Sequence, residues 1–207
     1  MGGREAELSR QISAFRDVLG KRHDPVSLPH LMQSQWRDEI SAVYAALGGS
    51  GSPGFRFGGW DIHLGDIIVE LDEEQHFNRY RALTLASPVY RSIPTLHHRD
   101  YVHWCADHET ACLRKAGHGG YWSKPATDRM FGPSGPEKDL TGRGSSRWKQ
   151  RAFYDFIRDA WQPVSGVPVV RLSVWETVAN DSIRLGEALN KGHPLPPDWL
   201  KARIFPG

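Results

Sequence analysis

The sequence has little cysteine, no long hydrophobic run and none of the common short motifs of nucleotide binding or acyl hydrolysis. Two cysteines among 207 residues cannot form a disulfide framework, so a reducing compartment, the cytoplasm, is expected. No run approaches the roughly 18 consecutive apolar residues that span a bilayer, and the N-terminus has no apolar stretch, which predicts no secretory signal. Neither G-x-x-x-x-G-K-[ST] nor G-x-S-x-G occurs, which argues against a P-loop or a nucleophile elbow.

Apolar residues make up 39% of the chain and charged residues 24%, which is enough apolar material for one ordinary core. We therefore expect a single domain over residues 1–207, with an insertion at about residues 82–145. The net charge of +2 is unevenly placed, because residues 113–151 hold nine basic and three acidic side chains and the remainder sums to −4. A basic segment on an acidic body indicates either a polyanionic partner or a solvated loop, and composition leaves both open.

Hydrophobic spacing predicts an α/β domain with a sheet flanked by helices. A literal G-x-G-x-x-G at residues 49–54 follows a predicted helix and precedes a predicted strand, the reverse of a dinucleotide site, so we interpret it as a loop. Residues 77–145 show no clear period apart from one helix. The predicted helices cover about residues 4–19, 35–47, 100–115, 146–161 and 176–190, and the predicted strands cover residues 55–63, 67–72 and 167–172.

The most informative segment is a predicted hairpin over residues 60–81. Gly65-Asp66 suits a two-residue type II′ turn, because glycine takes the first central position. That turn pairs Leu64 with Ile67, His63 with Ile68 and Ile62 with Val69, and it places Asp61 directly opposite Glu70. Asp72 lies two residues further along and therefore shares the face of Glu70.

Like charges directly opposite each other destabilise a hairpin unless a cation lies between them. Asp61 and Glu70 therefore predict a metal site, and oxygen ligands favour Mg²⁺ or Mn²⁺. The alternative is an exposed acidic hairpin with solvated side chains. Ile67, Val69 and Leu71 are expected to bury the opposite face, which would fix the register.

This segment resembles the very-short-patch-repair-like branch of the PD-(D/E)XK nuclease superfamily, whose fold is restriction-endonuclease-like. The resemblance covers about residues 35–81 and 146–190. The branch carries an acid in a first helix, an Asp on a strand, an E-x-D followed by Gln-His, and a late strand that reads like V-x-R. The matching residues are Glu39, Asp61, Glu70 with Asp72, Gln75 with His76, and Arg171.

The resemblance implies a nuclease with metal at Asp61 and Glu70, joined by Glu39, and with Asp72, Gln75 and His76 among the catalytic residues. The sequence departs from the superfamily pattern because Asp72 replaces the usual lysine and Glu73 replaces a small residue. His76 is then a candidate proton acceptor, since neutral imidazole accepts a proton near pH 7. Weaker candidates for helping the attacking water are His63 and Lys149, while Gln75 is more suited to orienting water or phosphate.

Two further groups of residues carry chemistry. Cys105, His108 and Cys112 are spaced to share one helical face, which is compatible with a zinc site or with buried packing. Arg147, Lys149 and Arg151 lie in the predicted late helix and are candidate phosphate contacts.

Taken together, these patterns favour a Mg²⁺- or Mn²⁺-dependent endonuclease that hydrolyses phosphodiester bonds, with DNA as the favoured substrate and no membrane association. The alternative is a non-catalytic nucleic-acid-binding module, or a zinc-stabilised interaction module, with the same fold. Oligomeric state has no signal in the sequence.

Overall fold

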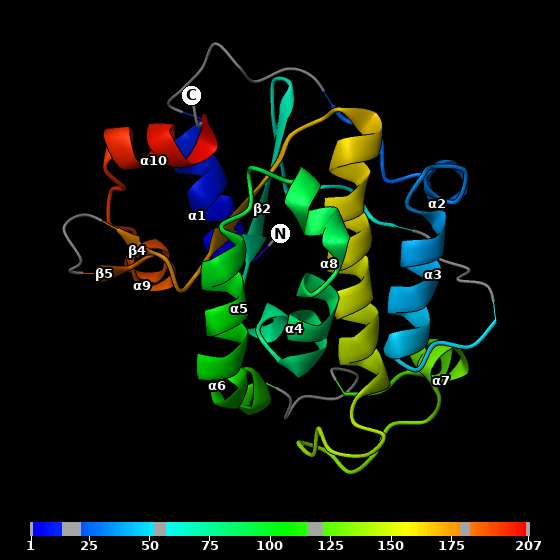
Figure 1. Ribbon diagram of the computed structural model, residues 1–207. Helices are drawn as coiled ribbons and strands as arrows, with labels where there is room; N and C mark the ends of the chain where they lie inside the picture. The colour runs from blue at the N-terminus through cyan, green and yellow to red at the C-terminus, as the bar shows by residue number, and fades with distance from the viewer. Residues whose placement is uncertain (1, 14–21, 52–56, 116–121, 179–182, 206–207) are drawn as a thin grey trace. The chain divides into compact units, whose positions relative to one another are not determined.

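The computed structural model describes residues 2–13, 22–51, 57–115, 122–178 and 183–205 (Figure 1). Contacts divide the chain into two compact units. We call residues 1–25, 58–73 and 167–207 the sheet unit, and residues 26–57 and 74–166 the helical unit.

The sheet unit is built on a three-stranded mixed sheet in the order β1-β2-β3. β1 (Ile62–Leu64) runs antiparallel to β2 (Ile67–Asp72), and β2 runs parallel to β3 (Val169–Ser173). Its helices are α1 (Gly3–Ile12), α9 (Leu185–Lys191) and α10 (Pro197–Ile204), and α10 packs against β3. A two-stranded antiparallel ladder, β4 (Thr177–Val178) with β5 (Ile183–Arg184), precedes α9.

The hairpin has the predicted turn and register. Ile62 pairs with Val69, His63 with Ile68, and Leu64 with Ile67. Gly65 has φ +58°, whereas Asp66 is not among the residues with positive φ, which is the signature of a type II′ turn. Burial differs from the prediction: β2 is covered on both faces, so Glu70 and Asp72 are buried along with Leu71.

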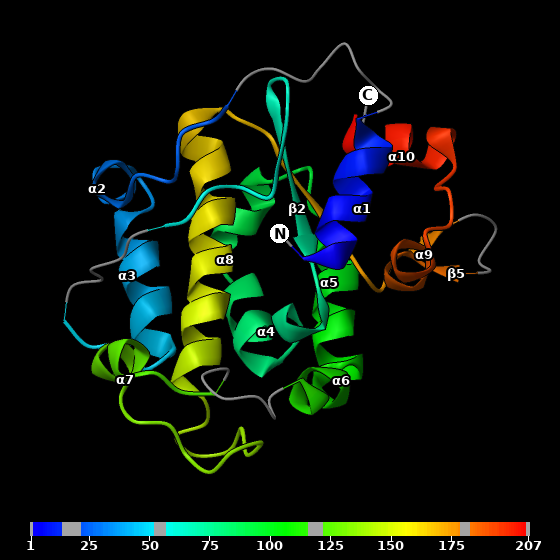
Figure 2. The same cartoon turned by 180° about the vertical axis from the view of Figure 1, so that it is seen from behind.

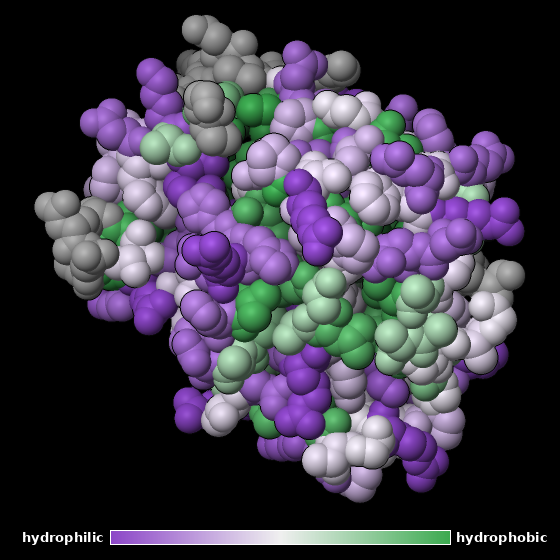
Figure 3. Space-filling view, in the orientation of Figure 1, coloured by the Kyte–Doolittle hydropathy of each residue, from purple (hydrophilic) through white to green (hydrophobic). Residues whose placement is uncertain are grey.

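The helical unit is organised around the long helix α8 (Ser146–Ser165), which begins at the Ser145 N-cap and ends at Gly166 with φ +74°. Both ribbon views show α8 lying between α3 (Arg37–Ala46) and α4 (Arg79–Leu85) (Figures 1 and 2). Apolar side chains emerge at the surface over α4 and α8 (Figure 3), and Leu83 of α4 is 37% exposed. The remaining elements of this unit are α2 (Leu28–Leu31), η2 (Glu74–His76), η3 (Pro88–Ser92), α5 (His98–Asp107), α6 (Glu109–Arg114) and α7 (Pro125–Phe131).

Several predicted elements were wrong. Residues 57–61 are not a strand, since Gly58 and Gly59 offer no side chain to pack; residues 52–56 and the predicted helix over 14–19 lie outside the described part of the chain. The helix expected over 176–190 is instead the β4–β5 ladder followed by α9. Apart from the helix expected over about 100–115, residues 77–145 were judged to lack a period, yet they also contain α4, η3 and α7 and so contribute further packed helices to the helical unit.

Candidate functional site

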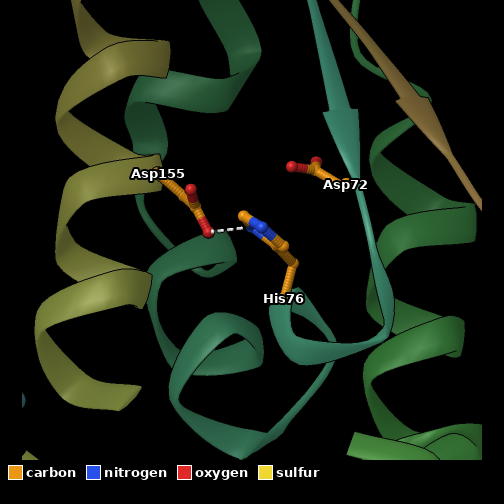
Figure 4. A group of neighbouring side chains, drawn as sticks. All are labelled: Asp72, His76 and Asp155. Atoms are coloured by element: carbon orange, nitrogen blue, oxygen red, sulfur yellow. Dashed lines mark hydrogen bonds and ion pairs between the residues drawn. The ribbon is translucent and has the colours of Figure 1, made fainter. Parts of the chain in front are cut away.

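Three side chains come together as a group that can hold a metal ion (Figure 4). Asp72 is the last residue of β2, His76 lies four residues later in η2, and Asp155 is on α8. One ligand atom from each lies within 4.8 Å of the other two, and both carboxylates are buried. Within the described residues this is the sole group of three or more acid, histidine or cysteine ligands, and we call it the acid–histidine cluster.

Hydrogen bonds fix the tautomer of His76. Its Nδ1 lies 2.8 Å from Asp155 Oδ2, and its Nε2 lies 3.1 Å from Arg151 Nη1. A guanidinium can only donate, so Nε2 accepts from Arg151 and Nδ1 carries the proton that is donated to Asp155. The imidazole is therefore neutral, and the Asp155 carboxylate fixes the orientation of its ring.

Asp72 is held as a carboxylate by an ion pair. Arg171 Nη1 lies 2.6 Å from Asp72 Oδ1, and both side chains are 1% exposed. Arg171 is on β3, next to Asp72 in the sheet, because β2 and β3 run parallel with Glu70 beside Arg171. This pairing offsets much of the cost of burying the Asp72 charge. Arg171 thus lies beside Asp72 across the sheet.

Asp61 and Glu70 make a reciprocal contact with the backbone at the open end of the hairpin. The backbone N–H of Asp61 donates to Glu70 Oε1 at 3.1 Å, and the N–H of Leu71 donates to Asp61 Oδ2 at 3.0 Å. The two carboxylates accept these bonds where the β1–β2 ladder has ended. Within the described residues they form no three-ligand group with Glu39, which is half-buried on α3. Their role as a metal pair stays a prediction.

The residues around His76 have structural partners. The backbone carbonyl oxygen of Gln75 accepts a hydrogen bond from Asn78 Nδ2 at 3.3 Å and lies 3.6 Å from Cys112 Sγ. His63 Nδ1 accepts from the backbone N–H of His23 at 3.0 Å, and burial lowers the pKa of His63, which favours its neutral form. A catalytic role for Gln75 or His63 remains a prediction.

The proposed zinc ligands Cys105, His108 and Cys112 do not form a metal-binding group in the described part of the chain, which corrects that alternative. The segment is two helices rather than one, because α5 ends at Asp107 and His108 has φ −114° and ψ 10°. Burial raises the pKa of the Cys112 thiol to about 12. Both cysteines are buried packing residues.

The three basic candidates on α8 each have a partner inside the protein. Arg147 donates to Gln150, and Lys149 Nζ lies 5.7 Å from the centroid of the Tyr80 ring. Burial lowers the pKa of Lys149. Arg151 donates to His76, so of the three it is the one that contacts the acid–histidine cluster.

Sequence reasoning missed Asp155. A signal was present: Asp155 and Asp159 stand at i and i+4 of α8, next to the buried Phe156 and Ala160, so both acids lie on the apolar face. Acids on that face need a partner. Asp155 is bonded to His76, and Asp159 accepts from Arg81 Nη2 at 2.7 Å.

The fold and the site define a mixed α/β protein with a buried Asp–His–Asp cluster that can hold a metal ion. The chain belongs to a family of unknown function, DUF7255, whose profile matches residues 42–191. Neither a curated protein nor a solved structure matches this chain. In the described residues, no helix combines the length and the apolar character that crossing a membrane requires.

Proposed function

We propose that this protein is a metal-dependent nuclease that hydrolyses phosphodiester bonds, with DNA as the favoured substrate. The observation that carries the proposal is the acid–histidine cluster, because two carboxylates and one imidazole within 4.8 Å form a compact set of metal ligands. The E-x-D and Gln-His motifs that resemble the nuclease branch contribute Asp72 and His76 to it.

The ligand set bears on the metal. Carboxylates suit Mg²⁺ and Mn²⁺, whereas an imidazole nitrogen suits Mn²⁺, Zn²⁺ and other transition metals better than Mg²⁺. We therefore favour Mn²⁺ over the Mg²⁺ that oxygen ligands alone indicate. A divalent cation supplies polarisation of the phosphoryl oxygen and activation of water.

The chain's own residues contribute the rest of the chemistry. Asp155 accepts a hydrogen bond from the Nδ1–H of His76, and the Nε2 lone pair of His76 accepts one from Arg151. Asp72, His76 and Asp155 would hold the divalent cation. The Arg151 guanidinium, which lies beside His76, has the geometry to donate two parallel hydrogen bonds to a phosphate.

Cleavage assays on plasmid DNA, single-stranded DNA and RNA, each with Mg²⁺, Mn²⁺ or Zn²⁺, test the proposal. We expect wild-type cleavage with Mn²⁺ and a loss of about 100-fold or more in His76→Gln and Asp155→Asn. Asp38→Asn, which changes an exposed acid at the start of α3, is the matched control and should cut like wild type. Cleavage by His76→Gln at the wild-type rate would place the active site elsewhere.

A second candidate function is a nucleic-acid-binding module that cuts nothing. It is favoured by the charge balance of the site, in which Asp72 is paired with Arg171 and both nitrogens of His76 are already bonded. A wild-type protein that binds DNA but cuts no substrate with any of the three metals would support this function over the nuclease.

A further inference from the structure

A cavity of about 630 Å³ lies in the helical unit between the end of α4, η3 and the start of α5. Its apolar part is formed by Leu85, Ala86, Pro88 and the ring of Tyr90, and its polar part includes Arg91, His98 and Arg99. The volume is in the range that encloses a small organic molecule. Every lining residue comes from the 15 residues between Leu85 and Arg99, so the cavity is a local feature of this unit.

The two arginines of the cavity are available for a ligand. In the described structure, neither Arg91 nor Arg99 forms an ion pair or a side-chain hydrogen bond, and both are exposed. None of the described residues that line the cavity is acidic. The acid nearest in sequence is Asp100, whose Oδ2 lies 3.6 Å from His97 Nδ1. Two guanidiniums without a carboxylate partner favour an anion, and their planar forks match phosphate oxygens.

The first turn of α5 strengthens the positive potential at the same place. Its N-cap, His97, makes no side-chain hydrogen bond to the helix, so the dipole of this ten-residue helix is not screened by a capping oxygen. The Nε2–H of His98 donates to the Leu85 carbonyl oxygen at 2.7 Å, so within the described structure Nδ1 is the ring nitrogen that makes no hydrogen bond.

The apolar wall is held rigidly. The hydroxyl of Tyr90 donates to Asp159 at 2.9 Å and accepts from Arg81 Nη1 at 2.8 Å, inside a buried ion pair between Arg81 and Asp159. The Tyr90 ring also lies 5.5 Å from the His98 ring, measured between centroids. This network fixes the position of Tyr90, so the wall need not reorganise when a ligand binds.

We propose that this cavity binds a nucleotide, with the phosphate held by Arg91 and Arg99 and the base packed among Leu85, Pro88 and Tyr90. A neutral or cationic ligand does not suit a wall that carries two arginines, and inorganic phosphate alone leaves the apolar part unfilled. The nucleotide is either free or one unit of a nucleic-acid strand. The proposal goes beyond the nuclease and does not depend on the acid–histidine cluster.

Calorimetric titration in low salt with EDTA tests the cavity without metal. The probes are 5′-AMP, adenosine, inorganic phosphate and a single-stranded oligonucleotide. The proteins are wild type, Arg91→Gln, Arg99→Gln and His76→Gln, with Arg37→Gln as a control at an exposed arginine outside the cavity. The arginine substitutions are at exposed positions, so thermal melting should show an unchanged fold.

We expect 5′-AMP to bind at least about tenfold more tightly than adenosine or phosphate, and each cavity variant to weaken binding about tenfold. Arg37→Gln and His76→Gln should bind like wild type, so a failed nuclease assay leaves this result intact. Arginine-dependent binding of the oligonucleotide but not of 5′-AMP would support the cavity with a strand as its source. Binding of neither, equal binding of phosphate or adenosine and 5′-AMP, or wild-type affinity in both cavity variants would overturn the proposal.

Discussion

At the scale of single residues, the structure depends on buried carboxylates that are each held by a nitrogen partner. Asp72 with Arg171, Asp155 with His76 and Asp159 with Arg81 each place a carboxylate against a nitrogen at 2.6–2.8 Å. Such a pair contributes little when compared with an apolar pair, but the loss of one partner leaves an uncompensated buried charge. Substituting the partner of one of these acids is therefore expected to destabilise the protein.

Substituting Arg171 by Met tests this directly. We expect unfolding to become easier by about 3–5 kcal/mol, because Asp72 is left 1% exposed without its guanidinium. The control is Lys191→Met, which removes an ion pair of similar length, 2.7 Å, whose side chains are 56% and 50% exposed; its effect should stay below about 1 kcal/mol. Chemical denaturation of the three proteins gives both values, and equal losses in the two variants would contradict the argument.

At the scale of elements, the hairpin was predictable because its turn and its pattern are local. Gly65 is required at φ +58°, a region in which a side chain is strained, and the alternation of residues 62–69 then sets the register. The hairpin is also where the predicted metal pair lies, with its carboxylates bonded to backbone N–H groups.

Gly65→Ala should therefore destabilise the protein by about 1–2 kcal/mol. Gly58→Ala is the matched control, since Gly58 has open space around its Cα and no positive φ, and it should have almost no effect. Melting temperatures of both variants measure the difference. A Gly65→Ala protein as stable as the control would mean that the turn conformation is not needed.

The rest of the site was less accessible to sequence reasoning for physical reasons. Asp72 and His76 could be predicted as site residues because Asp72 ends a recognisable strand and His76 follows it by only four residues. Asp155 is 79 residues from His76, and only the packing of α8 against η2 brings the two together. The helical break at His108, which divides the predicted helix into α5 and α6, depends on one backbone conformation that the periodicity of residues 100–115 does not encode.

At the scale of the whole molecule, the charge is distributed between the two units. The helical unit holds 16 basic and 11 acidic residues, a net charge of +5, whereas the sheet unit holds 10 basic and 13 acidic residues, a net charge of −3. Under the proposed function, the helical unit is therefore the part that we expect to contact nucleic acid. Because Arg147, Lys149 and Arg151 have partners inside the protein, the exposed cations Lys124, Arg129 and Arg143 are better candidates for phosphate contacts.

Neutralising Lys124, Arg129 and Arg143 together by substitution with Gln should reduce the slope of log affinity against log salt by about 2 to 3 for duplex DNA. The matched control replaces Arg10, Lys191 and Lys201, which are exposed cations of the sheet unit, and should leave the slope unchanged. Fluorescence anisotropy between low and moderate salt measures both slopes. Equal changes in the two triple variants would contradict the assignment of binding to the helical unit.

We propose above all that the acid–histidine cluster holds a divalent metal ion. Crystals grown with Mn²⁺ test it most directly, because anomalous scattering locates the ion without reference to activity. We predict a peak bounded by Asp72, His76 and Asp155, with metal–oxygen and metal–nitrogen distances of about 2.0–2.3 Å, and no peak in crystals of Asp155→Asn. A peak at Asp61 and Glu70 instead, or no peak at the cluster at saturating Mn²⁺, would contradict the claim.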